Sequence, residues 1–175
     1  MFLYLYLRLI DMSTNGSSSD LSEQIDLSDT EIAGRPVFAA SGNNLFVAFF
    51  QNNKIKLKYS QDNGASLSPS QDIMALEGNA NFLRVNAKDN IAVIVVVEQT
   101  NSGMSVKGVS GTLVGGNYVK RECPKRPLQG NITFNDILDV SIRINDDTSS
   151  DDFVFVKSTN GAAVTATGHH PHAPS

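Results

Sequence analysis

The sequence predicts an all-β protein, built as an antiparallel, β-propeller-like repeat of about three blades. Short apolar runs alternate with breaks rich in Asn, Gly and Asp, and no long stretch shows helical periodicity. The pattern also recurs: Asn44 and Asn90 both end a polar turn before a strongly apolar strand, and they lie 46 positions apart. A four-stranded propeller blade has about 40 to 50 residues, so this spacing predicts blades.

The individual strands follow from short runs of β-branched and aromatic residues. Such runs are too short for helices and predict strands at 45–50, 55–59, 91–97, 138–144 and 153–156. Each break supplies residues that tolerate positive φ in hairpin turns, at 43–44, 52–53, 62–64, 89–90, 115–117 and 146–147. One turn of helix at 21–27 is the single exception considered.

We expect three segments along the chain. Residues 1–20 form an apolar amino-terminal segment with a Ser-rich linker, and 21–168 form the β domain. For residues 1–10 three alternatives stay open, namely a signal peptide, a strand of the fold, or an extension upstream of Met12. Residues 169–175 hold all three His, and we expect a disordered tail with no metal site.

The totals exclude several classes of function. Lys and Arg number 14 against 18 Asp and Glu, a net charge of -4, and no basic stripe with interleaved aromatics indicates nucleic-acid binding. Cys123 is the single cysteine, so neither an intrachain disulfide nor a thiolate metal cluster is expected. No apolar run reaches the roughly 20 residues of a membrane span. No cofactor is indicated, and the compartment stays open, with secretion or the cell surface as one alternative.

A second repeat signal lies in the turns. Ser60-Gln61-Asp62-Asn63-Gly64 follows an alternating strand, and Ser158-Thr159-Asn160-Gly161-Ala162 echoes it 98 positions later. Ser110 stands midway, which suggests three units of nearly equal length. A Ser hydroxyl and an Asp carboxylate two residues apart can accept hydrogen bonds from turn amides. Gly64 suits a left-handed backbone.

The segment 60–67 resembles the Asp-box, or bacterial neuraminidase repeat, of sialidase-like β-propellers. The resemblance implies a structural turn at Ser60, Asp62 and Gly64, with a degenerate copy at Ser158 and Asn160. Leu67 stands where the family has an aromatic residue. Three blades do not close a ring. The resemblance therefore implies a partial propeller, or one completed by further copies as a homo-oligomer.

Catalytic residues of a sialidase are not recognisable in this sequence. The family carries an Arg-Ile-Pro element whose Arg binds the substrate carboxylate, and Arg35-Pro36 stands at a similar place without the Ile. Arg35 is thus the candidate for an anionic ligand. Few further arginines are available for the triad that holds the substrate carboxylate in that family: Arg84 and Arg143 in strand-like segments, and Arg121 and Arg126 in a predicted loop. We expect a non-catalytic module that binds a glycan or a protein. The alternative is a fragment or relic of a sialidase-like exo-glycosidase.

Overall fold

The described part of the chain folds almost entirely into antiparallel strands. The computed structural model describes residues 6–7, 25–26, 36–128, 132–144, 152–159 and 163–168. The strands are β1 (Tyr6–Leu7), β2 (Ile25–Asp26), β3 (Val37–Ser41), β4 (Asn44–Gln51), β5 (Lys54–Ser60), β6 (Gln71–Ala75), β7 (Asn79–Lys88), β8 (Ile91–Thr100), β9 (Gly103–Val114), β10 (Asn117–Pro127), β11 (Ile137–Arg143), β12 (Asp152–Ser158) and β13 (Ala163–Gly168). A 3-10 turn, η1 (Phe134–Asp136), precedes β11.

The predicted strands are confirmed, because each predicted run coincides with one observed strand, β4, β5, β8, β11 or β12, and only the run 138–144 extends one residue beyond its strand. Most of the predicted breaks also take the expected backbone, although the positive φ of the first turn falls at Gly42 and not at 43–44, and the break at 146–147 lies outside the described residues. Positive φ occurs at Asn52 and Asn53, at Asp89, and at Gly115 and Gly116. The predicted helical turn at 21–27 has no support, since Ile25–Asp26 pairs with β1 instead. In the described residues no helix has the length and apolar character needed to cross a membrane.

The strands form sheets of consecutive neighbours. β3 to β6 make a four-stranded sheet in chain order, β7 to β10 make a second, and β11 to β13 make a three-stranded sheet. Strands β1 and β2 pair separately. Every pairing is antiparallel. Short hairpins therefore join most neighbours, which is the arrangement that alternating runs and turns predict.

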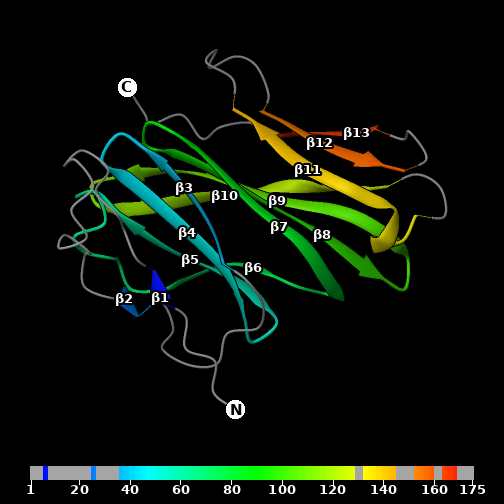
Figure 1. The fold of residues 1–175 in the computed structure, drawn as a ribbon, viewed down its shortest axis with the longest axis horizontal. Coiled ribbons are helices and arrows are strands. Elements are labelled where there is room, and N and C mark those ends of the chain that lie inside the picture. Colours follow the sequence, from blue (N-terminus) through cyan, green and yellow to red (C-terminus); the bar gives the residue numbers. More distant parts are fainter. Residues whose placement is uncertain are drawn as a thin grey trace, which may run out of the picture.

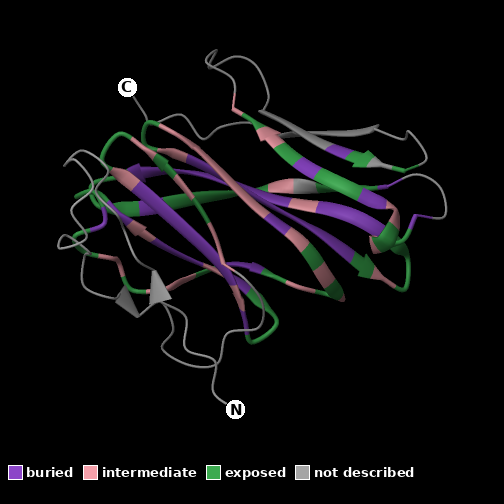
Figure 2. Ribbon diagram, viewed as in Figure 1, coloured by how far each residue is buried: buried purple, intermediate pink, exposed green. Residues whose placement is uncertain are grey.

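The middle sheet packs on both faces (Figures 1 and 2). Ile94 and Val96 of β8 belong to one core cluster, which also holds Phe46 and Ile55 of the first sheet. The intervening residues of β8 point the other way into a second cluster, which includes Ile137 of the third sheet. A strand that is buried on both faces reads as a continuous apolar run, which explains the sequence of β8.

The order of the sheets is that of a propeller-like array. The first strand of the middle sheet, β7, contacts β3 on one side and β11 on the other. The repeat that places Asn44 and Asn90 in equivalent hairpins is also confirmed. Asn44 begins β4 directly after the β3–β4 turn, and Asn90 lies in the turn between β7 and β8. The two hairpins touch: Asn44 Nδ2 donates to the Asp89 carbonyl oxygen at 2.8 Å, and Asp89 N donates to Ser41 Oγ at 2.7 Å.

The proposed equivalence of three serines is wrong for Ser110. Ser60 ends β5, the third strand of its sheet, whereas Ser110 is buried inside β9 and precedes no turn. Ser158 ends β12, which is the second described strand of its sheet. Strand length and hairpin position, and not a fixed spacing of serines, therefore define the repeat.

Candidate functional site

A groove lies where the β4–β5 hairpin approaches the beginning of β7. Its volume is about 680 Å3. The lining combines apolar, amide and cationic side chains, with no carboxylate among its described residues: Val37, Phe50, Gln51, Asn53, Lys54, Leu76, Gly78, Asn79, Ala80, Asn81, Phe82, Leu83 and Arg84. This mixture can offer a ring face, hydrogen-bonding amides and positive charge to a bound molecule.

The wall of the groove contains a β-bulge in β7. Asn81 pairs with Val97 of β8, and the next pair joins Arg84 to Val95. Two residues of β7 therefore stand opposite one residue of β8. The first of them, Phe82, has a φ of +54°, a left-handed conformation that costs a residue with a Cβ about 1–2 kcal/mol. Bulges and strained residues concentrate at binding and catalytic sites, so the bulge at Phe82 makes the groove the candidate binding site.

The ring of Phe82 is held in place by the third sheet's leading turn. Its centroid lies 6.4 Å from that of Phe134 in η1, with the two planes tilted by 38°. Both rings pack against the second core cluster. Since aromatic pairs at this separation attract one another, Phe134 offsets part of the backbone strain at Phe82.

Arg84 is the less neutralised of the two cations in the groove. Its Nη1 donates to the Leu83 carbonyl oxygen at 2.9 Å, and its Nη2 lies 4.0 Å from Asp139 Oδ1. Lys54 instead donates to Asp72 Oδ2 at 2.5 Å. The pKa of Asp72 lies below its ordinary value because Lys54 donates to it. The long Arg84–Asp139 contact leaves most of the guanidinium donors available to a ligand.

Hydrogen bonds with the backbone order two of the amide side chains in the groove. Asn53 Nδ2 donates to the Leu76 carbonyl oxygen at 2.9 Å, and Leu76 N donates back to the Asn53 carbonyl oxygen at 3.1 Å. Asn81 Oδ1 accepts from Phe82 N at 2.8 Å. These amides are therefore held in one orientation, which favours selective binding.

A second pocket lies on the other side of Gly78 and Asn79. Its volume is about 610 Å3, and its lining is polar: Glu77, Gly78, Asn79, Gln99, Thr100, Asn101 and Ser102. It sits beside the β8–β9 hairpin. Gly78 and Asn79 belong to both linings, so they form the wall shared by the groove and this pocket.

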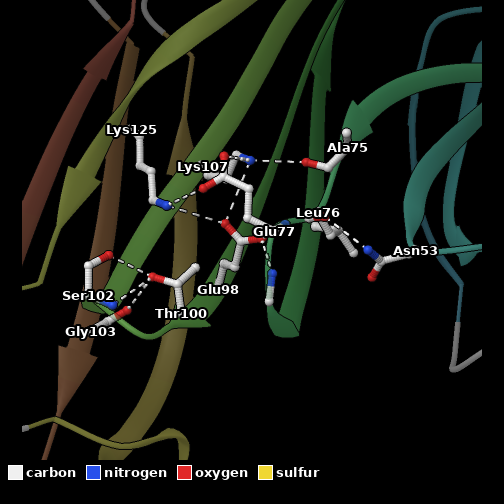
Figure 3. A network of polar contacts seen from close by, with 11 residues as sticks. Asn53, Ala75, Leu76, Glu77, Glu98, Thr100, Ser102, Gly103, Lys107 and Lys125 are labelled. Carbon is white, nitrogen blue, oxygen red and sulfur yellow. Dashed lines mark hydrogen bonds and ion pairs between the residues drawn. The ribbon is translucent and has the colours of Figure 1, made fainter.

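A buried carboxylate supports that wall from beneath (Figure 3). Glu98 of β8 is 0% exposed, and its Oε1 accepts from the amide of Glu77 and, at 2.9 Å, from Gly78 N. Its Oε2 has no hydrogen-bond partner in the described part of the chain, yet it lies 3.6 Å from Lys107 Nζ and 3.7 Å from Lys125 Nζ. Two ammonium groups therefore neutralise the buried charge, which would otherwise be costly.

Glu77 shares the same lysines at the surface. Lys125 Nζ donates to Glu77 Oε2 at 2.9 Å, and Lys107 Nζ donates to Oε1 at 3.1 Å. These bonds hold the pKa of Glu77 below its ordinary value and raise that of Lys125. Lys107 also donates to the Ala75 carbonyl oxygen at 3.0 Å, which ties β9 to β6. At neutral pH Glu77 is therefore an ionised partner of lysines and not a proton donor.

The turn after β5 forms a closed set of hydrogen bonds. Ser60 Oγ accepts from Asp62 N at 3.2 Å and from Gly64 N at 2.7 Å, and it donates to Asp62 Oδ1 at 2.6 Å. Asp62 Oδ1 also accepts from Ser66 N at 2.9 Å, and Gly64 has a φ of +84°. The seven residues of β5 separate this turn from Lys54 in the groove by about 20 Å at 3.3 Å per residue.

The predicted site residues thus have different outcomes. Arg35 and Asn160 lie outside the described residues, as does the side chain of Ser158, although Ser158 itself ends β12. Val37, two residues after Arg35, lines the groove, and Arg84 lies in it. Sequence reasoning missed Phe82 and Glu98. The one sequence signal for Glu98 is a lone carboxylate directly following the apolar run of β8.

Comparisons with known proteins assign no family. No protein-family model and no curated protein sequence matches the chain. Among solved structures, the crystal structure of an exo-1,5-α-L-arabinanase from a bovine ruminal metagenomic library is similar with a TM-score of 0.44 and 10% sequence identity. The match covers 79% of this chain and 55% of that structure, so the chain spans about half of its length. A similarity of this degree does not support a functional assignment. The Asp-box resemblance rests on the motif alone and stays a prediction.

Proposed function

We propose that the protein is a non-catalytic binding module whose groove takes an acidic glycan. One observation carries this proposal: the lining of the groove combines an aromatic ring, exposed amides and two cations, with no carboxylate among its described residues. The ring is that of Phe82, whose backbone is strained, the exposed amides are those of Asn53, Asn79 and Asn81, and the cations are Arg84 and Lys54. Sugar rings stack on aromatic faces, and their hydroxyl groups exchange hydrogen bonds with amides. A guanidinium group pairs well with a carboxylate or a sulfate.

The same lining argues against glycoside hydrolysis in this groove. Glycosidases of the common classes need a pair of carboxyl groups flanking the scissile bond. Glu98 is fully buried and accepts from backbone amides, whereas Glu77 lines the neighbouring pocket, not the groove, and is bonded to two lysines. Binding without cleavage is the function that these groups can perform.

The test is the affinity for acidic and neutral oligosaccharides, measured by titration calorimetry. We expect hexagalacturonate to bind and xylohexaose to bind much more weakly. Arg84→Ala should lower the hexagalacturonate affinity by about tenfold or more, the loss expected for one charge-assisted pair. Arg143→Ala is the matched control, since Arg143 is exposed at the end of β11 and does not line the groove.

The alternative of a sialidase-like fragment is tested by a separate measurement of sialoside hydrolysis. Hydrolysis of a fluorogenic sialoside that is lost in Arg35→Ala would replace the binding proposal by that of an exo-glycosidase. Equal affinity of Arg84→Ala and the unmodified protein for hexagalacturonate would also contradict the binding proposal.

A further inference from the structure

The groove and the second pocket lie side by side and share one wall. We propose that they form a single cleft that crosses Gly78 and Asn79, so that the ligand is a chain of several sugar units and not one terminal unit. This inference rests on the proposed function. Its basis is that Gly78 and Asn79 line both cavities, whose volumes are about 680 and 610 Å3. Each volume lies in the usual range for a ligand pocket.

Position 78, where the two cavities meet, has no room for a side chain. A Cβ at Gly78 would lie 2.1 Å from the Gln99 carbonyl oxygen, a distance that only a shift of the backbone could relieve. The chain therefore runs tightly against β8 at this point. A residue with a side chain would force this wall away from β8.

The two halves of the cleft differ in chemistry. Arg84 and the Phe82 ring lie in the groove, whereas the second pocket presents the hydroxyl groups of Thr100 and Ser102, whose Oγ atoms are 2.8 Å apart. The single carboxylate of that pocket, Glu77, is neutralised by two lysines. We therefore assign the charged sugar unit to the groove and a hydroxyl-rich unit to the pocket.

Glu98 is the positioning residue of this cleft. It touches no ligand, because it is fully buried, but it holds the amides of Glu77 and Gly78 with one oxygen. Its other oxygen faces Lys107 and Lys125. A carboxylate meets both requirements at once. A neutral amide side chain at this place would lose the negative charge for the lysines, and one of its two ends would point NH2 donors either at those lysines or at the backbone amides.

Chain length is the variable that tests the cleft. We expect hexagalacturonate to bind more tightly than digalacturonate by about tenfold or more, above the roughly fivefold statistical gain of five overlapping frames. Asn101→Trp fills the second pocket alone. It should reduce the ratio of the hexagalacturonate affinity to the digalacturonate affinity, the chain-length ratio, to about the statistical value of five, and it should leave digalacturonate binding unchanged. Asn117→Trp is the matched control in another hairpin, outside both cavities.

Three results overturn the cleft in distinguishable ways. If the chain-length ratio of the wild type is at the statistical value, the groove binds short ligands only. If the ratio is unchanged in Asn101→Trp, the second pocket takes no part in binding the longer ligand. In both cases the proposed function survives. Binding of neither oligogalacturonate overturns the proposed function and the cleft together.

The role of Glu98 has a readout that needs no ligand. Glu98→Gln should accelerate hydrogen exchange at the amides of Glu77 and Gly78 and should lower the chain-length ratio. Glu77→Gln removes a carboxylate from the same lysine pair but keeps both amide bonds, so exchange at these amides should stay slow. Unchanged exchange in Glu98→Gln, or equal acceleration in both variants, contradicts the assignment of Glu98.

Discussion

The conformation of Phe82 illustrates what single residues contribute to this fold. A left-handed backbone at a bulky residue is uncommon and persists only when surrounding contacts enforce it. Here the bulge in β7 and the ring of Phe134 enforce it. The strain is local to one residue of the groove wall, so its energetic consequence can be separated from the loss of the ring.

Substitutions at position 82 should reverse the usual order of Ala and Gly. In a strand interior Gly is normally less stable than Ala by about 0.5–1 kcal/mol. Because φ is +54° at Phe82, Phe82→Ala keeps the strain whereas Phe82→Gly removes it. Phe82→Gly should therefore be the more stable of the two by about 1 kcal/mol, as measured by urea denaturation. Both variants should bind hexagalacturonate more weakly, since both lose the ring.

Val85 provides the control in the same strand. It has no positive φ, so Val85→Ala should be more stable than Val85→Gly. The normal order at both positions would mean that the left-handed conformation of Phe82 does not hold in solution.

The sequence could suggest Arg84 but not Phe82 or Glu98. An arginine in a strand is a visible candidate for anion binding, whatever its partner. The bulge at Phe82 depends on which residues of β8 face β7, and the burial of Glu98 depends on the lysines of β9 and β10. Pairing between strands decides both features, and a single strand's sequence does not encode it.

At the scale of elements, the hairpins were the most predictable part of the fold. Asn, Asp and Gly occupy the positions of positive φ in the turns after β4, β7 and β9, because these residues tolerate that conformation at low cost. The sheet register could not be predicted in the same way, since the bulges in β6, β7 and β10 shift it.

The turn after β5 should make stability depend on acid pH through Asp62. Bonds from the Ser60 and Ser66 hydroxyls lower the pKa of Asp62 from 3.8 to about 2. Its folded pKa lies below the unfolded one, so the contribution is fully present above about pH 4 and is lost as the pH falls toward 2. Asp62→Ala should therefore lower the melting temperature at pH 7, and the difference from wild type should shrink at pH 2.

Gln61→Ala serves as the control in the same turn, since Gln61 is exposed and should have a small effect at both pH values. A pH-independent difference between Asp62→Ala and wild type would show that the carboxylate charge does not stabilise the turn.

At the scale of the whole molecule, the middle sheet couples its two neighbours. The alternating side chains of β8 enter both core clusters, so loosening either cluster affects the same strand. The stacking of sheets in chain order was predictable from the repeat, because each unit of consecutive hairpins must cover its apolar face with the next unit. Completion of the array by further copies stays a prediction, to be tested by the mass in solution.

Truncations in the two clusters should therefore destabilise one cooperative unit. Ile94 and Ile137 are both buried, at 0% and 5% exposure, in different clusters. Ile94→Ala and Ile137→Ala should each cost about 2–5 kcal/mol through lost burial and the cavity left behind. Both should unfold in urea in a single transition with an unchanged m-value, since both core clusters contain residues of β8. Leu138→Ala is the matched control next to Ile137: Leu138 is 56% exposed, so its truncation should cost about 0.5 kcal/mol or less. Two separate transitions in Ile137→Ala would instead show that the third sheet unfolds on its own, and that the middle sheet does not couple the array.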